Sequence, residues 1–238
     1  MHPNRKFHIG SRVEMAAIVS SIGFGMVTAQ TQEGLRCVHA PLFLDGNRLR
    51  FHVARGNAVH AALASGAEAL AVVNGPDAYV SPDWYGLEDR VPTWSYVAVE
   101  MGGPVRPMSD AELLRLLDDM SAEHEARLAP KPAWTRDKMS PARFDGLLKA
   151  ITGFELDIRD WRGTAKIDQD KPAEVRTRVG AAMAEQGWHD MPALYSSPSP
   201  DGEGNHPKHG GGVIPPEDTP PPHFVRFPSP SRLGEEQG

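Results

Sequence analysis

Apolar and polar residues alternate along much of the first hundred positions, and this pattern predicts a series of short β-strands. The clearest are expected at residues 22–30, 35–44 and 48–54, with hairpin turns at Thr31-Gln32-Glu33-Gly34 and Asp45-Gly46-Asn47. The same pattern predicts further strands at 69–74, 79–81 and 93–101. Successive strands joined by hairpins indicate an antiparallel sheet or barrel.

Apolar residues spaced three and four apart predict helices around this sheet. Short helices are expected at 14–21 and 58–65, the second capped by Asn57. Ser109-Asp110-Ala111-Glu112 is a capping box that opens a third helix. A fourth starts at Ser140-Pro141, and its apolar face is formed by Phe144, Leu147, Leu148 and Ile151. A returning strand at 153–158 and a last helix at 172–186 complete an α+β domain.

The composition changes near residue 190. Residues 191–238 contain 11 prolines and 7 glycines in 48 positions, so they cannot bury enough apolar surface to offset their ordering entropy. We therefore expect one domain at 1–190 and a poorly ordered Pro/Gly-rich tail at 191–238. The only apolar islands of the tail are Val213-Ile214 and Phe224-Val225-Arg226-Phe227. Its His206-Pro207-Lys208-His209 lacks further ligands, and no metal site is predicted.

Charge and cysteine content exclude several classes of protein. The formal charge of −6 argues against a domain that grips nucleic acid electrostatically. The single cysteine, Cys37, rules out an internal disulfide and suits a reducing cytoplasm. No signal segment or membrane-spanning stretch is expected. Dinucleotide and Walker loops, a nucleophile elbow and a His-Glu-x-x-His motif are all missing from the sequence.

Residues 75–96 hold three of the four tyrosines and two of the five tryptophans. Beside proline-fixed turns, such rings form walls suited to a flat ligand or a partner subunit. A packed core is the alternative interpretation. A second candidate lies at Arg55-Gly56-Asn57, because an arginine beside a helix start favours an anion such as phosphate. The alternative there is a simple helix cap with an arginine in water.

Four stretches in this order and spacing resemble the PaiB-type FMN-binding negative transcriptional regulators. They are His39-Ala40-Pro41, His52-Val53-Ala54-Arg55-Gly56-Asn57, Gly75-Pro76-Asp77-Ala78-Tyr79-Val80-Ser81-Pro82-Asp83-Trp84-Tyr85 and Val91-Pro92-Thr93-Trp94-Ser95-Tyr96. The eleven-residue block from Gly75 is the most specific. Gly153-Phe154-Glu155-Leu156-Asp157-Ile158 and Gly163-Thr164-Ala165-Lys166 also resemble the family, so the likeness covers about residues 1–188.

The resemblance implies an FMN-binding split β-barrel with peripheral helices, in which a homodimer holds FMN between its subunits. It implies a phosphate held by Arg55 and Asn57, a ring edge lined by His39 and Pro41, and a further cofactor contact at His52. The remaining pocket residues that it implies are Ser81, Trp84, Tyr85, Thr93, Trp94 and Lys166. No catalytic residue is implied.

One segment departs from the family pattern. Where the family has Lys-Leu-Ser-Gln-Asn, this chain has Lys166-Ile167-Asp168-Gln169-Asp170, with two added carboxylates. Negative charge beside a phosphate would weaken its binding by Coulomb repulsion.

Two functions stay open from the sequence. The first is a regulator that acts through a protein or small-molecule partner, since the acidic balance argues against strong direct DNA binding. The second is a flavin-dependent oxidoreductase akin to pyridoxamine phosphate oxidases or flavin reductases. The sequence does not decide whether the protein is an enzyme.

Overall fold

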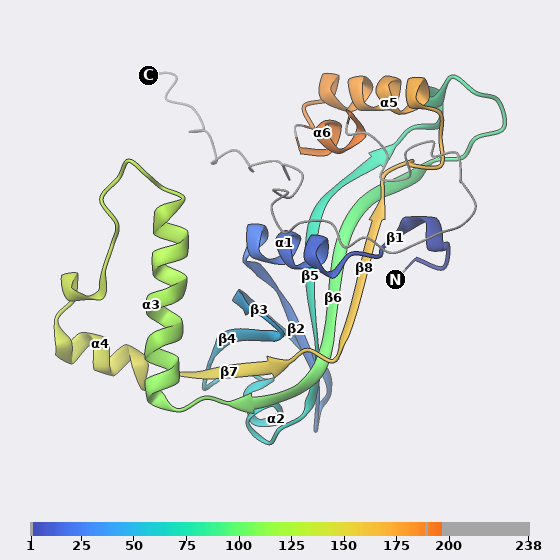
Figure 1. Cartoon of the computed structure of the whole chain (residues 1–238). Helices are drawn as coiled ribbons and strands as arrows, with labels where there is room; N and C mark the ends of the chain where they lie inside the picture. Colours follow the sequence, from blue (N-terminus) through green and yellow to red (C-terminus); the bar gives the residue numbers. More distant parts are fainter. Residues whose placement is uncertain (1, 189, 197–238) are drawn as a thin grey trace, which may run out of the picture. The chain divides into compact units, whose positions relative to one another are not determined.

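The computed structural model describes residues 2–188 and 190–196 (Figure 1). The chain divides into two compact units, each described by itself below. The described part of unit 1 comprises residues 2–75 and 97–165, and that of unit 2 comprises residues 76–96, 166–188 and 190–196. The single domain expected at 1–190 stays a prediction from the sequence.

Eight strands form one sheet in the order β1-β8-β6-β5-β2-β3-β4-β7. An additional β6–β7 pairing closes six of them into a ring, β2–β3–β4–β7–β6–β5. The strands are β1 (His8–Ile9), β2 (Phe24–Thr31), β3 (Gly34–Asp45), β4 (Arg48–Ala54), β5 (Glu68–Val80), β6 (Thr93–Pro107), β7 (Ile151–Asp157) and β8 (Asp160–Lys166). The predicted antiparallel α+β barrel is confirmed, and so are both hairpin turns.

Side chains alternate between the two faces of the barrel wall, as strand geometry requires. Along β3 and β4, the buried positions are Val38, Ala40, Leu42, Leu49, Phe51 and Val53. The rings of Phe51 and Phe154 stack at 5.8 Å inside the barrel, where both are fully buried. The intervening residues of β3 and β4 therefore face outward.

Six α-helices are described: α1 (Arg12–Ile22), α2 (His60–Ala64), α3 (Asp110–Ala126), α4 (Pro141–Leu148), α5 (Ala173–Glu185) and α6 (Asp190–Ser196). Three short 3₁₀ turns accompany them: η1 (Arg5–Phe7), η2 (Pro82–Tyr85) and η3 (Arg136–Lys138). The predicted capping box is confirmed, because Ser109 and Glu112 bond reciprocally at the start of α3. Helix α4 is shorter than predicted, since Ile151 begins β7 instead of continuing the helix.

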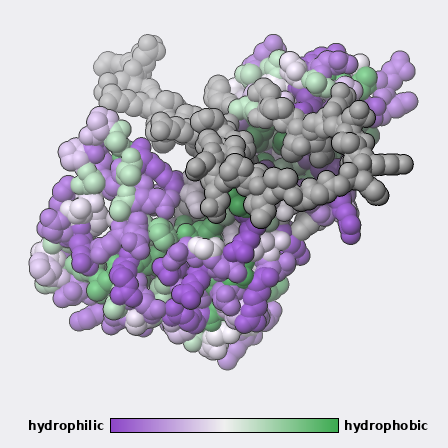
Figure 2. Space-filling model, in the orientation of Figure 1, coloured by the Kyte–Doolittle hydropathy of each residue, from purple (hydrophilic) through white to green (hydrophobic). Residues whose placement is uncertain are grey.

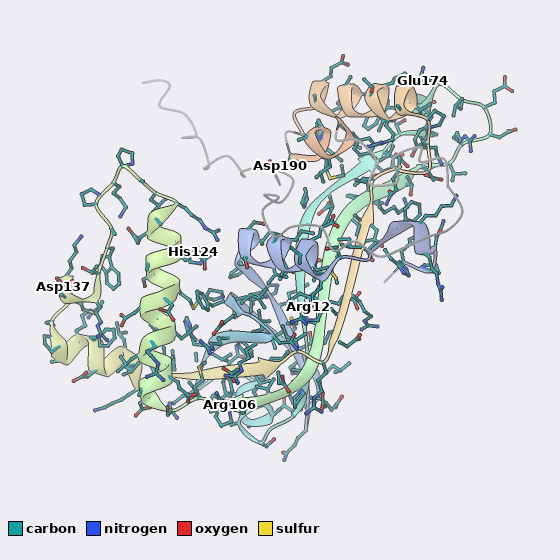
Figure 3. All side chains as sticks on the ribbon, viewed as in Figure 1. Arg12, Arg106, His124, Asp137, Glu174 and Asp190 are labelled. Carbon is teal, nitrogen blue, oxygen red and sulfur yellow. The ribbon has the colours of Figure 1, made fainter. Side chains whose placement is uncertain are left out.

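Helix α3 holds the end of α1 in place within unit 1. Arg127 donates hydrogen bonds to the carbonyls of Ser20 and Ser21, which a helix C-terminus leaves without partners. Gly23 ends α1 with a φ of 63°, and a Cβ at Gly23 would lie only 2.9 Å from the His124 ring. Figure 3 shows His124 on α3, on the side that faces α1.

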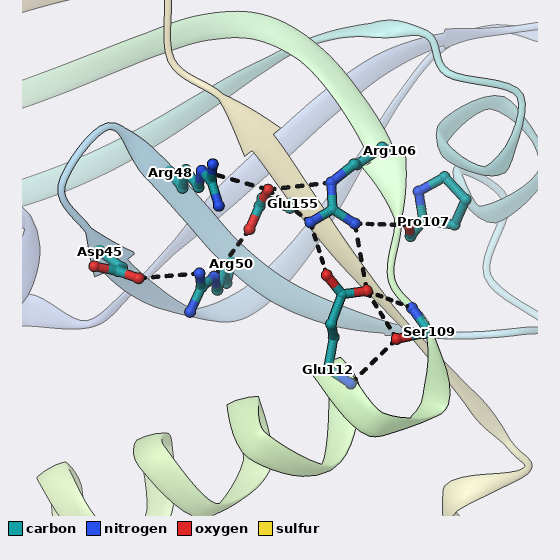
Figure 4. Close-up of polar contacts among 8 residues, drawn as sticks. All are labelled: Asp45, Arg48, Arg50, Arg106, Pro107, Ser109, Glu112 and Glu155. Atoms are coloured by element: carbon teal, nitrogen blue, oxygen red, sulfur yellow. Dashed lines mark hydrogen bonds and ion pairs between the residues drawn. The ribbon is translucent and has the colours of Figure 1, made fainter.

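A buried carboxylate lies where β7 closes the barrel (Figure 4). Glu155 is 6% exposed and stands opposite Arg50 of β4 and Arg106 of β6. It accepts hydrogen bonds from Arg50 Nε at 3.0 Å and from Arg106 Nη2 at 2.9 Å. Arg106 also bonds Glu112, and that contact lowers the pKa of Glu112 to about 2. This cluster joins three strands and α3.

Unit 2 has its own apolar core. Ala78, Val80 and Tyr85 pack against residues of α5 and α6 that include Val175, Val179, Met183, Met191 and Tyr195. Helix α6 begins at Asp190 and continues into 191–238, the segment assigned to the tail by composition, and its Met191 and Tyr195 are buried. The other tail features, including both apolar islands and His206-Pro207-Lys208-His209, lie outside the described residues.

Candidate functional site

Three of the predicted site residues share the outer face of the β3–β4 wall in unit 1. His39 and Pro41 alternate with the buried residues of β3, and His52 alternates with those of β4. His39 is exposed, and its ring stacks on Phe24 of the neighbouring strand at 6.4 Å. This face therefore offers an imidazole, a proline and an aromatic ring side by side to a flat ligand.

His52 is only partly accessible to solvent. Its Nδ1 is buried and has no hydrogen-bond partner among the described residues. Burial lowers the pKa of His52, so its ring is favoured in the neutral form. The opposite residue on β7 is Gly153, where a Cβ would meet Met108 at 2.9 Å and Leu113 at 3.2 Å. His52 thus lies at a closely packed part of the wall.

Arg55 follows β4 directly and is exposed. Its Nε donates to the carbonyl oxygen of Lys149 at 2.9 Å. Neither Nη atom has a hydrogen-bond partner among the described residues, so both nitrogens are available to donate to an anion. A Cβ added to the adjacent Gly56 would meet nothing within 4 Å, so a ligand has room to approach this backbone.

The expectation that Asn57 caps a helix at 58–65 is wrong. Helix α2 begins at His60, and its N-cap position is Val59. The Asn57 side chain instead accepts a hydrogen bond from the Val59 N–H at 3.1 Å, an Asx turn that delays the helix. Because α2 has only five residues, its dipole is small. Any anion at this turn depends mainly on Arg55.

Unit 2 brings three other predicted residues together. Lys166 Nζ donates to Thr93 Oγ1 at 2.5 Å and to the Trp94 carbonyl at 2.7 Å. Burial lowers the pKa of Lys166. The exposed Trp94 ring meets the Tyr79 ring edge to face at 6.2 Å. The strands β5, β6 and β8 thus present a cation beside an aromatic pair.

The last three predicted residues surround the η2 turn of unit 2. Ser81 is its N-cap without a side-chain cap bond, and Trp84 packs against the core of the unit. Tyr85 is only 3% exposed, and its hydroxyl donates to Asp168. Burial and the Asp168 charge both raise the pKa of Tyr85. Tyr85 therefore packs in a core, which is the alternative that the sequence left open for the aromatic residues of 75–96.

Sequence reasoning missed a buried polar network around Asp168. This carboxylate, 5% exposed, accepts from Tyr85 Oη at 3.1 Å and from Tyr195 Oη at 2.8 Å. Tyr195 also shares a 2.5 Å hydrogen bond with the buried Ser95. Asp170, the other added carboxylate, pairs with Lys171 at 2.9 Å. Both departures from the family pattern therefore have local partners in unit 2.

Asp168→Ala is expected to destabilise unit 2 by about 2–3 kcal/mol. It leaves the buried Tyr85 hydroxyl without this acceptor, and an unsatisfied buried donor costs about 1–3 kcal/mol. Urea unfolding followed by tryptophan fluorescence measures this, because Trp84 and Trp188 pack against the unit 2 core. Asp170→Ala is the control, expected to cost under about 1 kcal/mol. Equal costs for the two variants would contradict the structural role of the network.

The chain is similar in sequence to known proteins of one family. The profile of the family described as "Putative FMN-binding domain" matches residues 1–160. The chain is also 30% identical over 175 residues to "Protease synthase and sporulation protein PAI 2" of Bacillus subtilis, covering 72% of this chain and 83% of that protein. The chain therefore belongs to a family of FMN-binding domains. Within it, the chain is of the PaiB type, and FMN is the cofactor that this membership assigns.

Two solved structures share the fold. The FAD and heme binding protein from Mycobacterium smegmatis has a TM-score of 0.50 at 20% identity, over 67% of this chain and 73% of that chain. A conserved hypothetical protein from Mycobacterium tuberculosis has a TM-score of 0.51 at 12% identity, over 72% of this chain and 94% of that chain. At these identities the likeness shows the fold alone. Across residues 2–188 and 190–196, no helix is long and apolar enough to cross a membrane.

Proposed function

We propose that this protein is a homodimeric FMN-binding regulator whose cofactor phosphate is anchored by Arg55. The observation that carries the proposal is the exposed guanidinium beside an open glycine, with both Nη donors lacking a protein partner among the described residues. This donor set fits a phosphate, because Arg presents two parallel N–H bonds to an oxyanion. When bound, FMN supplies the redox chemistry of its flavin ring.

The protein's part in this proposal is to bind and orient the cofactor. Arg55, Gly56 and Asn57 hold the phosphate end, and His39 and Pro41 line the ring. His52 supports the wall behind them. In unit 2, Thr93, Trp94 and Lys166 form a further contact surface, while Ser81, Trp84 and Tyr85 shape the η2 turn. A cytoplasmic location belongs to the same proposal, resting on the single cysteine.

Arg55→Ala tests the anchor. One charge-assisted hydrogen bond contributes about 1.5–3 kcal/mol, so FMN affinity is expected to fall roughly 10- to 150-fold. Riboflavin lacks the phosphate, so its affinity should barely change. Fluorescence-quenching titrations of both flavins measure the contrast. Arg36→Ala, another exposed arginine of unit 1 outside the proposed contacts, is the control. Equal losses for the two flavins, or no loss for FMN, would remove Arg55 from the site.

The homodimer is supported by the apolar outer face of the β2–β3 hairpin. Phe24 and Leu35 are 52% and 66% exposed there, and they share this face with His39 and Pro41. Apolar side chains gathered on one sheet face mark an interface. A second copy covering this face would also enclose the ring contacts, so a single copy leaves the site incomplete.

Leu35→Glu is expected to separate the dimer. It places a charge on the proposed apolar interface, and burying an unpaired charge is unfavourable. Light scattering should give about twice 25.9 kDa for the wild type and the single-chain mass for the variant. Val13→Glu, on the exposed side of α1 in the same unit, should remain dimeric. A wild-type monomer at micromolar concentration would refute the shared site.

Regulation through a partner, rather than through strong direct DNA contact, is the second part of the proposal. The relative's name links that protein to protease synthesis and sporulation. In this chain, Arg48, Arg50 and Arg106 pair with three carboxylates, Glu155, Asp45 and Glu112, so their cluster offers little net positive charge to phosphates. Hydrophilic residues cover most of the unit 1 face in Figure 2. A salt-sensitive shift of random duplex DNA at micromolar protein would contradict this part.

A further inference from the structure

Arg55 connects the β4 turn to the end of α4 by two hydrogen bonds. Its backbone N–H donates to the Ala150 carbonyl and its Nε donates to the Lys149 carbonyl, each at 2.9 Å. The last carbonyls of a helix lack intrahelical partners and carry the negative end of its dipole. A cation at this place therefore caps α4 from outside the helix.

Helix α4 depends on such external contacts. It has eight residues and none of them is buried, and a helix this short is marginal in water by itself. Apart from its junction with β7, the described contacts include the Arg136 guanidinium over the Phe144 ring at 6.0 Å. Gly146 in its interior lowers its helical propensity further. The order of α4 therefore depends on the hydrogen bonds that Arg55 donates at its C-terminal end.

We infer that α4 is a positioning element for the FMN phosphate, so that cofactor binding and helix order are coupled. This inference rests on the proposed function of Arg55. A guanidinium is planar, with Nε on one edge and the Nη pair beside it. With Nε fixed on the Lys149 carbonyl, the side chain loses rotational freedom before the phosphate arrives. Binding then costs less ordering entropy.

The coupling is reciprocal, as every linkage between two equilibria must be. A phosphate that holds the Nη pair also holds Nε on the Lys149 carbonyl and so stabilises the last turn of α4. Riboflavin has no phosphate and leaves the helix unaffected. Lysine could not replace Arg55, because its single ammonium cannot serve the carbonyl and a bidentate phosphate in the same planar arrangement.

Gly146 allows a test in both directions. A Cβ at this position would meet nothing within 4 Å, so alanine fits without a clash and raises helical propensity. Gly146→Ala should tighten FMN binding by up to about fivefold, and Gly146→Pro should weaken it by roughly tenfold. Gly10→Ala is the matched control, since Gly10 lies in unit 1 with equally open surroundings.

The experiment titrates FMN and riboflavin into these variants, alone and combined with Arg55→Ala. Hydrogen exchange of amides 144–150 is followed with each flavin. We expect FMN alone to slow this exchange, riboflavin affinity to stay constant, and both Gly146 effects to vanish without Arg55. The inference is overturned if neither Gly146 variant changes FMN affinity, or if both flavins change alike. If Arg55→Ala itself leaves FMN affinity intact, the proposed function fails together with the inference.

Discussion

Gly103→Ala is expected to lower the free energy of unfolding by about 3 kcal/mol or more. A Cβ at Gly103 would lie 1.9 Å from the backbone oxygen of Asp157, and a backbone atom cannot rotate away as a side chain can. The strands that close the barrel would have to separate, and overpacking of this kind costs about 1–3 kcal/mol, occasionally more. At roughly 2–4 °C per kcal/mol, the melting temperature should fall by about 6–12 °C.

The neighbouring glycine supplies the control for this prediction. A Cβ at Gly102 would meet its nearest atom, the Asp160 Cβ, at 3.8 Å, an ordinary van der Waals contact. Gly102→Ala should therefore change the unfolding free energy by less than about 1 kcal/mol. Denaturant unfolding of both variants by circular dichroism provides the comparison. If Gly103→Ala proves as stable as Gly102→Ala, the close approach of β6 to the end of β7 is wrong.

Glu155→Ala is the second large effect that we expect, at about 3 kcal/mol. Removing one partner of a buried ion pair typically costs 3–5 kcal/mol. The lower end applies because the Arg48 and Arg106 side chains are 58% and 47% exposed and can turn towards water. The loss should persist at high salt, since salt screens buried pairs weakly. Denaturant titrations at two ionic strengths measure both features.

Asp45→Ala is the matched control for Glu155. Asp45 also pairs with Arg50, at 3.0 Å, but its side chain is 56% exposed. Exposed pairs of this kind contribute about 0–1 kcal/mol. A cost for Asp45→Ala as large as that for Glu155→Ala would show that burial is not what makes the cluster important.

The hairpins of the barrel could be predicted because their signals are local. Strand β4 was predicted with its exact bounds, and the Thr31 to Gly34 turn was read from its own residues. The lengths of β5 and β6 could not be predicted. Gly75-Pro76 and Gly102-Gly103 look like breaks in the sequence. In the fold, Gly75 instead lets Val97 approach within 3.0 Å of its Cβ position, so the strand continues through it.

The candidate site could be predicted only for residues that lie in a short sequence motif. Arg55 and Gly56 stood out by their order along the chain, whereas the Lys149 carbonyl is a backbone group 94 residues away that no pattern marks. Tyr85 and Asp168 likewise meet across 83 residues. Asp168 has a φ of 56°, which the sequence does not signal, since left-handed backbone is uncommon for residues other than glycine.

Unit 2 is built from two segments that the ribosome synthesises at different times. Ala78, Val80 and Tyr85 are translated well before the α5 and α6 residues that cover them, with about 70 residues between Tyr96 and Lys166. At roughly 5–20 residues per second, these apolar side chains wait several seconds on the ribosome without their partners. A chain that stops before Lys166 exposes them permanently. The delay between the two segments therefore exposes apolar surface to aggregation during translation.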